Sequence, residues 1–185
     1  MLAELRGWTP FVGMQIEYSL IERTSERELL PMARELDIGV MAWSVLANGI
    51  LTGKYNKQAQ GQETSGARRL DKAQFADLSE RNLAIADTVQ QVAQTLGRTP
   101  SQVAINWVRS KGIIPILGAT KVPQIQDNLD CLEFELTEEH LQTLDDVSKI
   151  QLGFPHEFLA RTKEPTYGGM FDAIDNHRSS RGIFI

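Results

Sequence analysis

The stretch from residue 113 to residue 128 constrains the fold of this chain most, because it combines a strand, a tight turn and a helix start. Ile113 to Leu117 is a short apolar run, typical of a strand that is buried on both faces. Gly118 to Lys121 is a small polar turn, and helical spacing of apolar residues begins near Val122. The first N–H groups of such a helix attract anions. The pattern predicts an anion site with Lys121 as a mobile charge, or an ordinary turn with a surface lysine.

Two earlier segments repeat the order of strand and helix. Phe11 to Tyr18 and Gly39 to Trp43 predict strands, and Ser25 to Glu28 predicts a capping box that begins a helix. That helix is expected to bury Leu29, Leu30, Ala33 and Leu36. Alternating strands and helices are typical of an α/β fold with a parallel sheet. A closed (β/α)8 barrel needs eight strands in about 250 residues, so three such units predict only part of a barrel.

Further helices are expected around this sheet. One runs from Ser79 to Leu96, a second begins at the capping box Thr99-Pro100-Ser101-Gln102, and a third follows Thr137. The second should bury Val103, Ala104, Trp107 and Val108. Two helices joined by a short turn could also form a DNA-binding helix-turn-helix, although the second offers only Arg109 and Lys111 as cations. Residues 151–185 show no clear periodicity and are expected to form a tail.

The net charge, the apolar runs and the cysteine count limit the kinds of function that this chain can have. The net charge of −5 and the lack of a basic run argue against nucleic acid as a partner. No apolar run approaches the length of a membrane span, and the start lacks a signal-peptide pattern. The single cysteine, Cys131, favours a reducing compartment, so a cytoplasmic location is expected and no metal site is predicted. The start also looks like the end of a helix that stops at Gly7, which suggests that part of a larger domain is missing.

Three motifs at the strand ends resemble one protein family. They are Gln15-Ile16-Glu17-Tyr18-Ser19, the run Ala-Trp-Ser-Val-Leu-Ala-Asn-Gly-Ile-Leu-Thr-Gly-Lys-Tyr at 42–55, and Leu117-Gly118-Ala119 with Gln124 and Asn128. In this order and spacing they resemble the aldo-keto reductases, which are NADP(H)-dependent oxidoreductases on a (β/α)8 TIM barrel. The resemblance implies that residues 1–150 are the C-terminal half of such a barrel. Residues 151–185 would then cover the barrel or the substrate pocket.

The resemblance also implies a cofactor site. Gln15 would hold the nicotinamide carboxamide, Trp43 would stack on the nicotinamide ring, and residues 44–49 would follow the pyrophosphate. Lys54 and Arg68 would close over the pyrophosphate and adenine side, and the turn at 118–121 would take the 2′-phosphate. The implied cofactor-binding set is Gln15, Trp43, Ser44, Val45, Leu46, Ala47, Gly49, Leu51, Lys54, Arg68, Gly118, Ala119, Thr120, Lys121, Gln124, Asp127 and Asn128.

The chain departs from the family pattern at informative positions. Many members carry a lysine at Gly118 and an arginine at Gln124, and those charges hold the 2′-phosphate. Here both residues are neutral, so either Lys121 compensates or the preference for NADP(H) is relaxed towards NAD(H). Asn48 stands where a smaller residue is usual.

The family's catalytic Asp, Tyr, Lys and His lie on early strands that this chain does not match, so no catalytic residue is assigned. None of the tyrosines and histidines here matches the family's pattern; they are Tyr18, Tyr55, Tyr167, His140, His156 and His177. Three interpretations remain open. The chain is part of an oxidoreductase that acts on a small carbonyl or alcohol, a non-catalytic nucleotide-binding module, or a half-barrel that self-associates.

Overall fold

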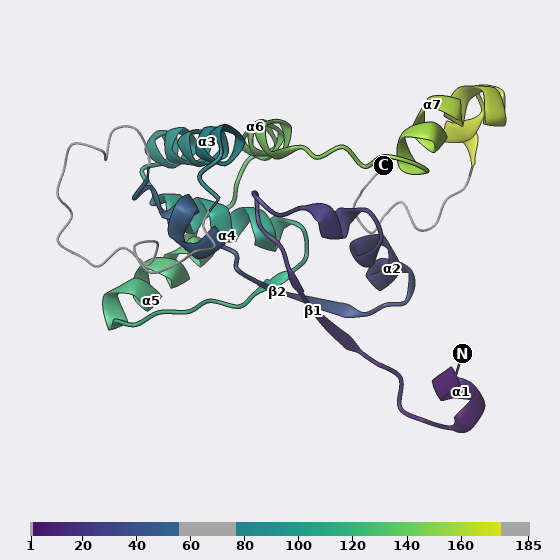
Figure 1. The fold of residues 1–185 in the computed structure, drawn as a ribbon, viewed down its shortest axis with the longest axis horizontal. Coiled ribbons are helices and arrows are strands. Elements are labelled where there is room, and N and C mark those ends of the chain that lie inside the picture. Colours follow the sequence, from purple (N-terminus) through teal and green to yellow (C-terminus); the bar gives the residue numbers. More distant parts are fainter. Residues whose placement is uncertain (1, 56–76, 175–185) are drawn as a thin grey trace.

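A computed structural model describes residues 2–55 and 77–174 of the chain (Figure 1). Its centre is a three-stranded parallel sheet in the order β1 (Gly13–Glu17), β2 (Gly39–Trp43) and β3 (Ile114–Pro115). The register sets Glu17 opposite Trp43 and Met41 opposite Ile114. The α/β class and the parallel sheet are therefore confirmed, and the arrangement is consistent with part of a barrel.

Seven α-helices and four 3-10 helices accompany the strands in the described residues. The α-helices are α1 (Leu2–Arg6), α2 (Leu29–Glu35), α3 (Glu80–Leu96), α4 (Pro100–Ser110), α5 (Val122–Leu129), α6 (Glu138–Ser148) and α7 (His156–Tyr167). The 3-10 helices are η1 (Thr24–Glu26), η2 (Ala47–Thr52), η5 (Asp130–Glu133) and η6 (Phe171–Ala173).

The ends of α3 and α4 follow directly from local sequence. The Ser79 side chain accepts a hydrogen bond from the backbone of Asn82, and Gly97 ends α3 in the left-handed conformation at φ 62°. Thr99 and Gln102 form both bonds of the predicted capping box at the start of α4. These signals act within one turn of helix, so the sequence alone was enough to predict them.

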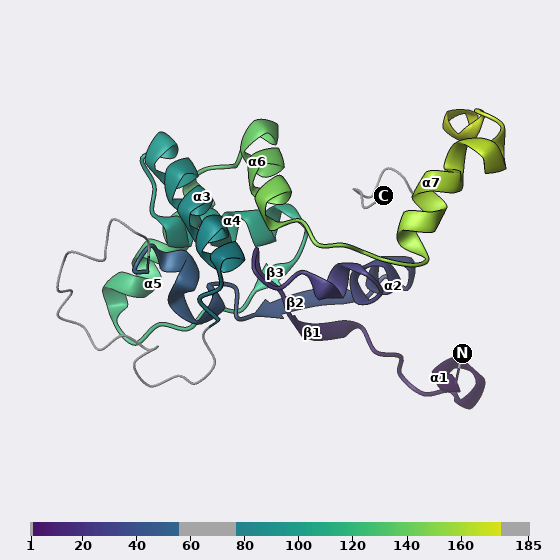
Figure 2. The ribbon, with the colours of Figure 1, turned by 45° about the horizontal axis from the view of Figure 1, so that its top comes forward.

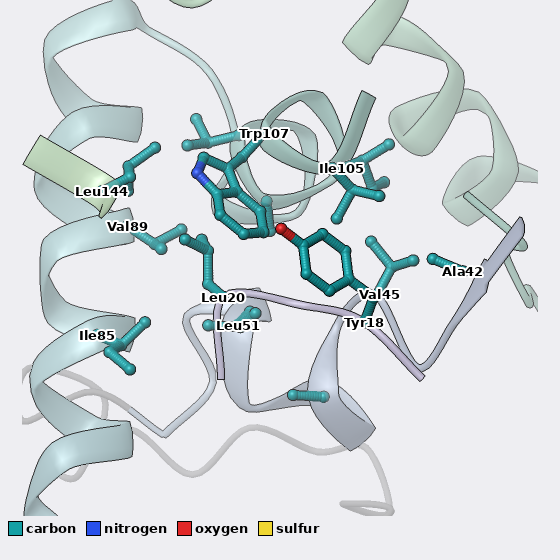
Figure 3. Close-up of a cluster of buried hydrophobic side chains, with 14 of the residues drawn as sticks. Tyr18, Leu20, Ala42, Val45, Leu51, Ile85, Val89, Ile105, Trp107 and Leu144 are labelled. Carbon is teal, nitrogen blue, oxygen red and sulfur yellow. The ribbon is translucent and has the colours of Figure 1, made fainter. Parts of the chain in front are cut away.

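The hydrophobic core lies between one face of the sheet and the helices. In Figures 1 and 2, α3, α4 and α6 gather on the same side of β1 and β2. Figure 3 shows Tyr18 beside Trp107 in this core, and their rings stack with centroids 5.4 Å apart. The four residues that the sequence placed on the buried face of α4 are all buried; they are Val103, Ala104, Trp107 and Val108.

The other face of the sheet is uncovered, which corrects the expectation that the strands are buried on both faces. Ile114 is 62% exposed, and Trp43 and Ile116 are each 42% exposed. Among the described residues no helix packs over this face, so apolar side chains that were read as doubly buried remain open. β3 is also shorter than predicted, although the Ile116 N–H still donates to the Ala42 carbonyl oxygen at 2.7 Å just beyond its end.

Two predictions about helices were wrong. Ser25 does not cap α2, because its hydroxyl donates to the backbone oxygen of Glu17 and the helix begins only at Leu29. Leu30 is buried as predicted, as is Ala33, but Leu29 and Leu36 are exposed, since no described element covers that side of α2. Helix α7 lies within residues 151–185, where the sequence shows no clear periodicity, and no residue of this helix is buried.

A buried polar cluster ties the end of β1 to α4 and α6. Tyr18 donates its hydroxyl proton to Glu26 Oε1 at 2.6 Å, and Arg23 Nε lies 2.8 Å from the same oxygen. Arg23 Nη1 also donates to Ser148 Oγ and lies 3.0 Å from Asp145 Oδ1. Burial, with the Glu26 carboxylate as the next cause, raises the pKa of Tyr18 far above its usual value. Its phenol therefore stays protonated at neutral pH.

Candidate functional site

Gln15 and Trp43 share the uncovered face of the sheet. Glu17 pairs with Trp43 across β1 and β2, and residues two apart on a strand point to the same side. Both Gln15 and Trp43 are exposed. The Tyr18 N–H donates to the Trp43 carbonyl oxygen at 3.3 Å, which continues the pairing one residue beyond the end of β1. The sheet therefore brings together an amide and an indole ring that are 28 positions apart in sequence.

A tightly wound loop follows Trp43. Ser44, Ala47 and Asn48 have positive φ angles of 60°, 46° and 56°, and Gly49 follows at 95°. Ala47 N–H donates to Ser44 O at 2.7 Å, and Gly49 N–H donates to Leu46 O at 2.9 Å. Asparagine adopts the left-handed region more readily than most residues, which gives a physical reason for Asn48 here.

Some of the predicted cofactor-binding residues in this loop have buried side chains. Val45, Ala47 and Leu51 are only 2%, 8% and 0% exposed and belong to the hydrophobic core. A ligand lying along this loop could meet these three residues only through their backbone. Lys54 is exposed, so its ammonium group is accessible at the end of the loop.

Gly53 fixes where this loop ends. Its φ is 81°, and an added Cβ would lie 2.6 Å from Gln90 Oε1 and 3.2 Å from Pro100 Cγ. The positive φ favours glycine at this position, and a Cβ would also require Gln90 and Pro100 to shift. The end of the Trp43–Lys54 segment is thereby held against α3 and the first turn of α4.

A small cavity of about 290 Å3 opens at the carboxyl ends of β1 and β2. Its lining includes Ser44 and Ala47, which the sequence predicted to bind the cofactor. The other lining residues were not among the predicted cofactor-binding residues. Only the position of Glu17 at a strand end could have pointed to this site. The Arg81 guanidinium is already engaged, because it donates to the carbonyl oxygens of Ile21 and Ser148. The lining residues are Glu17, Ser19, Ile21, Glu22, Ser44, Ala47, Asn48, Ile50, Asp77, Arg81 and Asn82.

The third predicted segment forms the turn between β3 and α5. Residues 118–121 are all exposed, and Lys121 is the N-cap of α5 without a side-chain capping bond. The Gln124 amide oxygen accepts the Thr120 N–H at 2.9 Å and the Thr120 hydroxyl at 3.1 Å. Gln124 therefore folds back over the turn, while the Lys121 side chain remains exposed beside it.

Asp127 is half-buried and Asn128 is buried. Asp127 accepts hydrogen bonds from Thr99 Oγ at 3.2 Å and from Gln102 Nε2 at 3.0 Å, and Asn128 is only 5% exposed. The observed contacts of Asp127 are thus with α4. The predicted site residue Arg68 lies outside the described residues.

Comparison with known proteins shows which family this chain belongs to. The model of the Aldo/keto reductase family matches residues 1–149. The chain belongs to the aldo/keto reductase family. It is 37% identical over 147 residues to the uncharacterized oxidoreductase YrpG of Bacillus subtilis, covering 78% of this chain and 43% of YrpG. It is 31% identical to the putative aryl-alcohol dehydrogenase AAD16 of Saccharomyces cerevisiae, covering 80% of this chain and 43% of the relative.

Solved structures agree with this assignment. The glycerol dehydrogenase AKR11B4 from Gluconobacter oxydans superposes with a TM-score of 0.61 at 29% identity, covering 79% of this chain and 45% of that one. The chain therefore spans less than half the length of YrpG, of AAD16 and of this enzyme. In residues 2–55 and 77–174, no cluster of His, Cys, Asp and Glu could hold a metal ion. Nor is any helix there long and apolar enough to cross a bilayer.

Proposed function

We propose that this chain is the cofactor-binding, C-terminal half of an NADP(H)-dependent aldo-keto reductase. The observation that supports this proposal best is the shared, uncovered face of Gln15 and Trp43, followed directly by the tightly wound loop at 44–53. An amide beside an exposed indole suits a flat, amide-bearing ring such as nicotinamide. The catalytic residues of the complete enzyme would lie on strands that this chain does not contain.

Each exposed group has a proposed task. Gln15 would bind the carboxamide, and Trp43 would stack on the ring and so fix which side faces the substrate. The backbone of the loop from Ser44 to Gly49 would follow the pyrophosphate, with Lys54 near it. When bound, the cofactor supplies the hydride. The residues of this chain would bind the cofactor and orient its nicotinamide ring, so that the ring is held in the geometry that the reaction needs.

Lys121 is the proposed partner of the 2′-phosphate. It is exposed at the start of α5, while Gly118 and Gln124 supply no charge, and the Gln124 amide oxygen is occupied by Thr120. One ammonium group at a helix N-terminus can still attract a phosphate. The preference for NADP(H) over NAD(H) would therefore depend on Lys121.

Calorimetry with two variants tests the cofactor site. Trp43→Ala should weaken NADPH and NADH binding equally, because both cofactors carry nicotinamide. Lys121→Ala should weaken NADPH more than NADH, since a charge-assisted hydrogen bond contributes about 1.5–3 kcal/mol. Equal losses for both cofactors in Lys121→Ala would remove Lys121 from the 2′-phosphate site. No binding by the unaltered chain would contradict the cofactor site itself.

The proposed substrate of the complete enzyme is a small carbonyl compound or alcohol. Relatives are described as a glycerol dehydrogenase and as putative aryl-alcohol dehydrogenases, and these descriptions share the interconversion of alcohol and carbonyl. The acidic net charge gives no support for a nucleic-acid partner, and the single buried thiol of Cys131 fits a reducing, cytoplasmic location.

The uncovered surfaces favour a second proposal, that the 185-residue chain self-associates when alone. Val122, Ile125 and Leu129 on α5 are 68%, 44% and 53% exposed, in addition to the open face of the sheet. Contiguous apolar surface and unpaired strand edges promote association in water. Light scattering after size-exclusion chromatography should show species larger than 20.7 kDa or loss of protein. A sharp monomer peak with a cooperative thermal transition would contradict this proposal.

A further inference from the structure

We propose that the first turn of α4, from Thr99 to Gln102, positions the two cofactor-binding segments relative to each other, with Gln102 as the central positioning residue. The inference rests on the proposed cofactor site, because it concerns how that site is held in shape. One segment is the loop from Trp43 to Lys54, and the other is the turn at 118–121 with α5.

Gln102 and Thr99 connect α4 to α5 through Asp127. Gln102 Nε2 donates to the Asp127 carbonyl oxygen at 2.9 Å and to Asp127 Oδ1 at 3.0 Å. Thr99 Oγ donates to Asp127 Oδ2 at 3.2 Å. Gln102 is only 4% exposed and Asp127 is half-buried, so these bonds are partly shielded from water. Together they fix the C-terminal part of α5, the helix whose N-terminal end carries Lys121 and Gln124.

The capping box determines which end of the Gln102 amide reaches α5. Gln102 Oε1 accepts the Thr99 N–H at 3.2 Å, and the Gln102 N–H donates to Thr99 Oγ at 3.3 Å. Because the amide oxygen is held by the cap, the amide nitrogen is the part that faces Asp127. A glutamate could serve the cap equally well, but it would have no proton to donate to Asp127.

The same turn contacts the loop segment. Pro100, the first residue of α4, has its Cγ 3.2 Å from the position that a Cβ on Gly53 would occupy. Gly53 ends η2 and directly precedes Lys54. The first turn of α4 therefore lies next to the end of one proposed cofactor segment, leaving no room there for a larger residue without a shift, and it holds the other segment through hydrogen bonds. A dinucleotide has to span both segments, so a rigid connection between them reduces the cost of ordering the site.

Gln102→Glu separates this role from simple helix capping. The variant keeps an acceptor for Thr99 but places a carboxylate against the Asp127 carboxylate and carbonyl oxygen, which repels both. We expect the affinity for adenosine 2′,5′-bisphosphate, measured by calorimetry, to fall about tenfold, the size of one lost hydrogen bond to a charged group. Amide hydrogen exchange should accelerate in α5 and stay unchanged in α3. Gln94→Glu, the same charge change at an exposed position on α3, should alter neither measurement.

A polarity swap provides the rescue. Combining Gln102→Glu with Asp127→Asn restores a donor and an acceptor between the two side chains in reversed order, and should slow amide exchange in α5 again. If the unaltered chain binds the bisphosphate and Gln102→Glu binds it equally well, only the positioning role is overturned. If the unaltered chain does not bind it, the proposed cofactor site fails and the positioning role fails with it.

Circular dichroism shows whether Gln102→Glu remains folded. If it does not, Asp127→Ala replaces it, because that variant leaves the capping box of α4 intact while removing the carboxylate that Thr99 and Gln102 hold. Faster exchange in α5 would then support the positioning role, and unchanged exchange would overturn it.

Discussion

The 185-residue chain alone is expected to give no measurable carbonyl-dependent oxidation of NADPH. Carbonyl reduction needs a proton donor beside the developing alkoxide, and general acid catalysis typically contributes about 10²–10⁴-fold. In the function proposed above, that donor and its supporting residues would lie on strands that this chain does not contain. Loss of NADPH absorbance in the presence of an aromatic aldehyde measures the reaction, with a full-length relative as the positive control.

The burial of Tyr18 supports this expectation. Tyr18 is fully buried, its hydroxyl is bonded to Glu26, and burial raises its pKa. A phenol in that position cannot reach a carbonyl on the open face of the sheet. Tyr167 lies on α7, with its ring edge-on to Phe171 at 5.1 Å between centroids.

Three variants define what would contradict the prediction; they are Tyr18→Phe, Tyr55→Phe and Tyr167→Phe. Activity in the unaltered chain that disappears in just one of them would identify a proton donor that the argument missed. Activity that survives all three would indicate a different chemistry. A fusion of this chain to the remaining strands of a full-length relative, which supply Asp, Tyr, Lys and His, should in contrast reduce simple aldehydes.

The sequence predicted best what local interactions decide. The cap at Ser79, the capping box at Thr99 and the glycine at the end of α3 depend on bonds within one helical turn, and all three are present. The three parallel strands were also predicted, because their apolar runs are separated by helical segments. The resemblance to aldo-keto reductases was confirmed by the family match over residues 1–149.

The sequence failed where the outcome depends on distant neighbours. Leu36 and Ile114 are apolar and were read as buried, yet they are 62% exposed, because burial requires a second surface that the described residues do not provide. The capping box at Ser25 failed because residues 24–26 form η1 and the Ser25 hydroxyl donates to the Glu17 carbonyl oxygen. Hydrogen bonds over 122–125 positions, as from Arg23 to α6, cannot be read from spacing.

Removal of the Arg23 side chain is expected to destabilise the fold strongly. Arg23 is 5% exposed and Glu26 7% exposed, and the two form a bidentate pair with distances of 2.8 Å and 3.1 Å. In Arg23→Met, the Glu26 carboxylate would stay buried, and within this cluster only the Tyr18 hydroxyl would still donate a hydrogen bond to it. Breaking a buried ion pair from one side costs about 3–5 kcal/mol. Urea denaturation at fixed protein concentration measures the loss, since self-association would make apparent stability concentration-dependent.

Matched variants separate the effect of losing the ion pair on stability from the effect of losing a long side chain. Arg27→Met changes an exposed arginine whose Nη2 donates to the Gln151 carbonyl oxygen, and it should alter the free energy of unfolding by no more than about 0.5 kcal/mol. Arg23→Met combined with Glu26→Gln removes both charges and should recover a large part of the loss, because a neutral amide is far less costly to bury than a carboxylate. A double-mutant cycle built from these two substitutions gives the interaction energy between Arg23 and Glu26 directly.

The size of the Arg23→Met effect also tests how the end of β1 is held. Arg23 reaches Ser148 and Asp145 on α6, while its partner Glu26 accepts from Tyr18 immediately after β1. The cluster therefore joins the strand that carries Gln15 to the outer helices. A loss below about 1 kcal/mol, with no recovery in the double variant, would mean that the cost of desolvating both ions offsets their attraction. The stacked rings of Tyr18 and Trp107 would then be the main contact that holds this end of the sheet against α4.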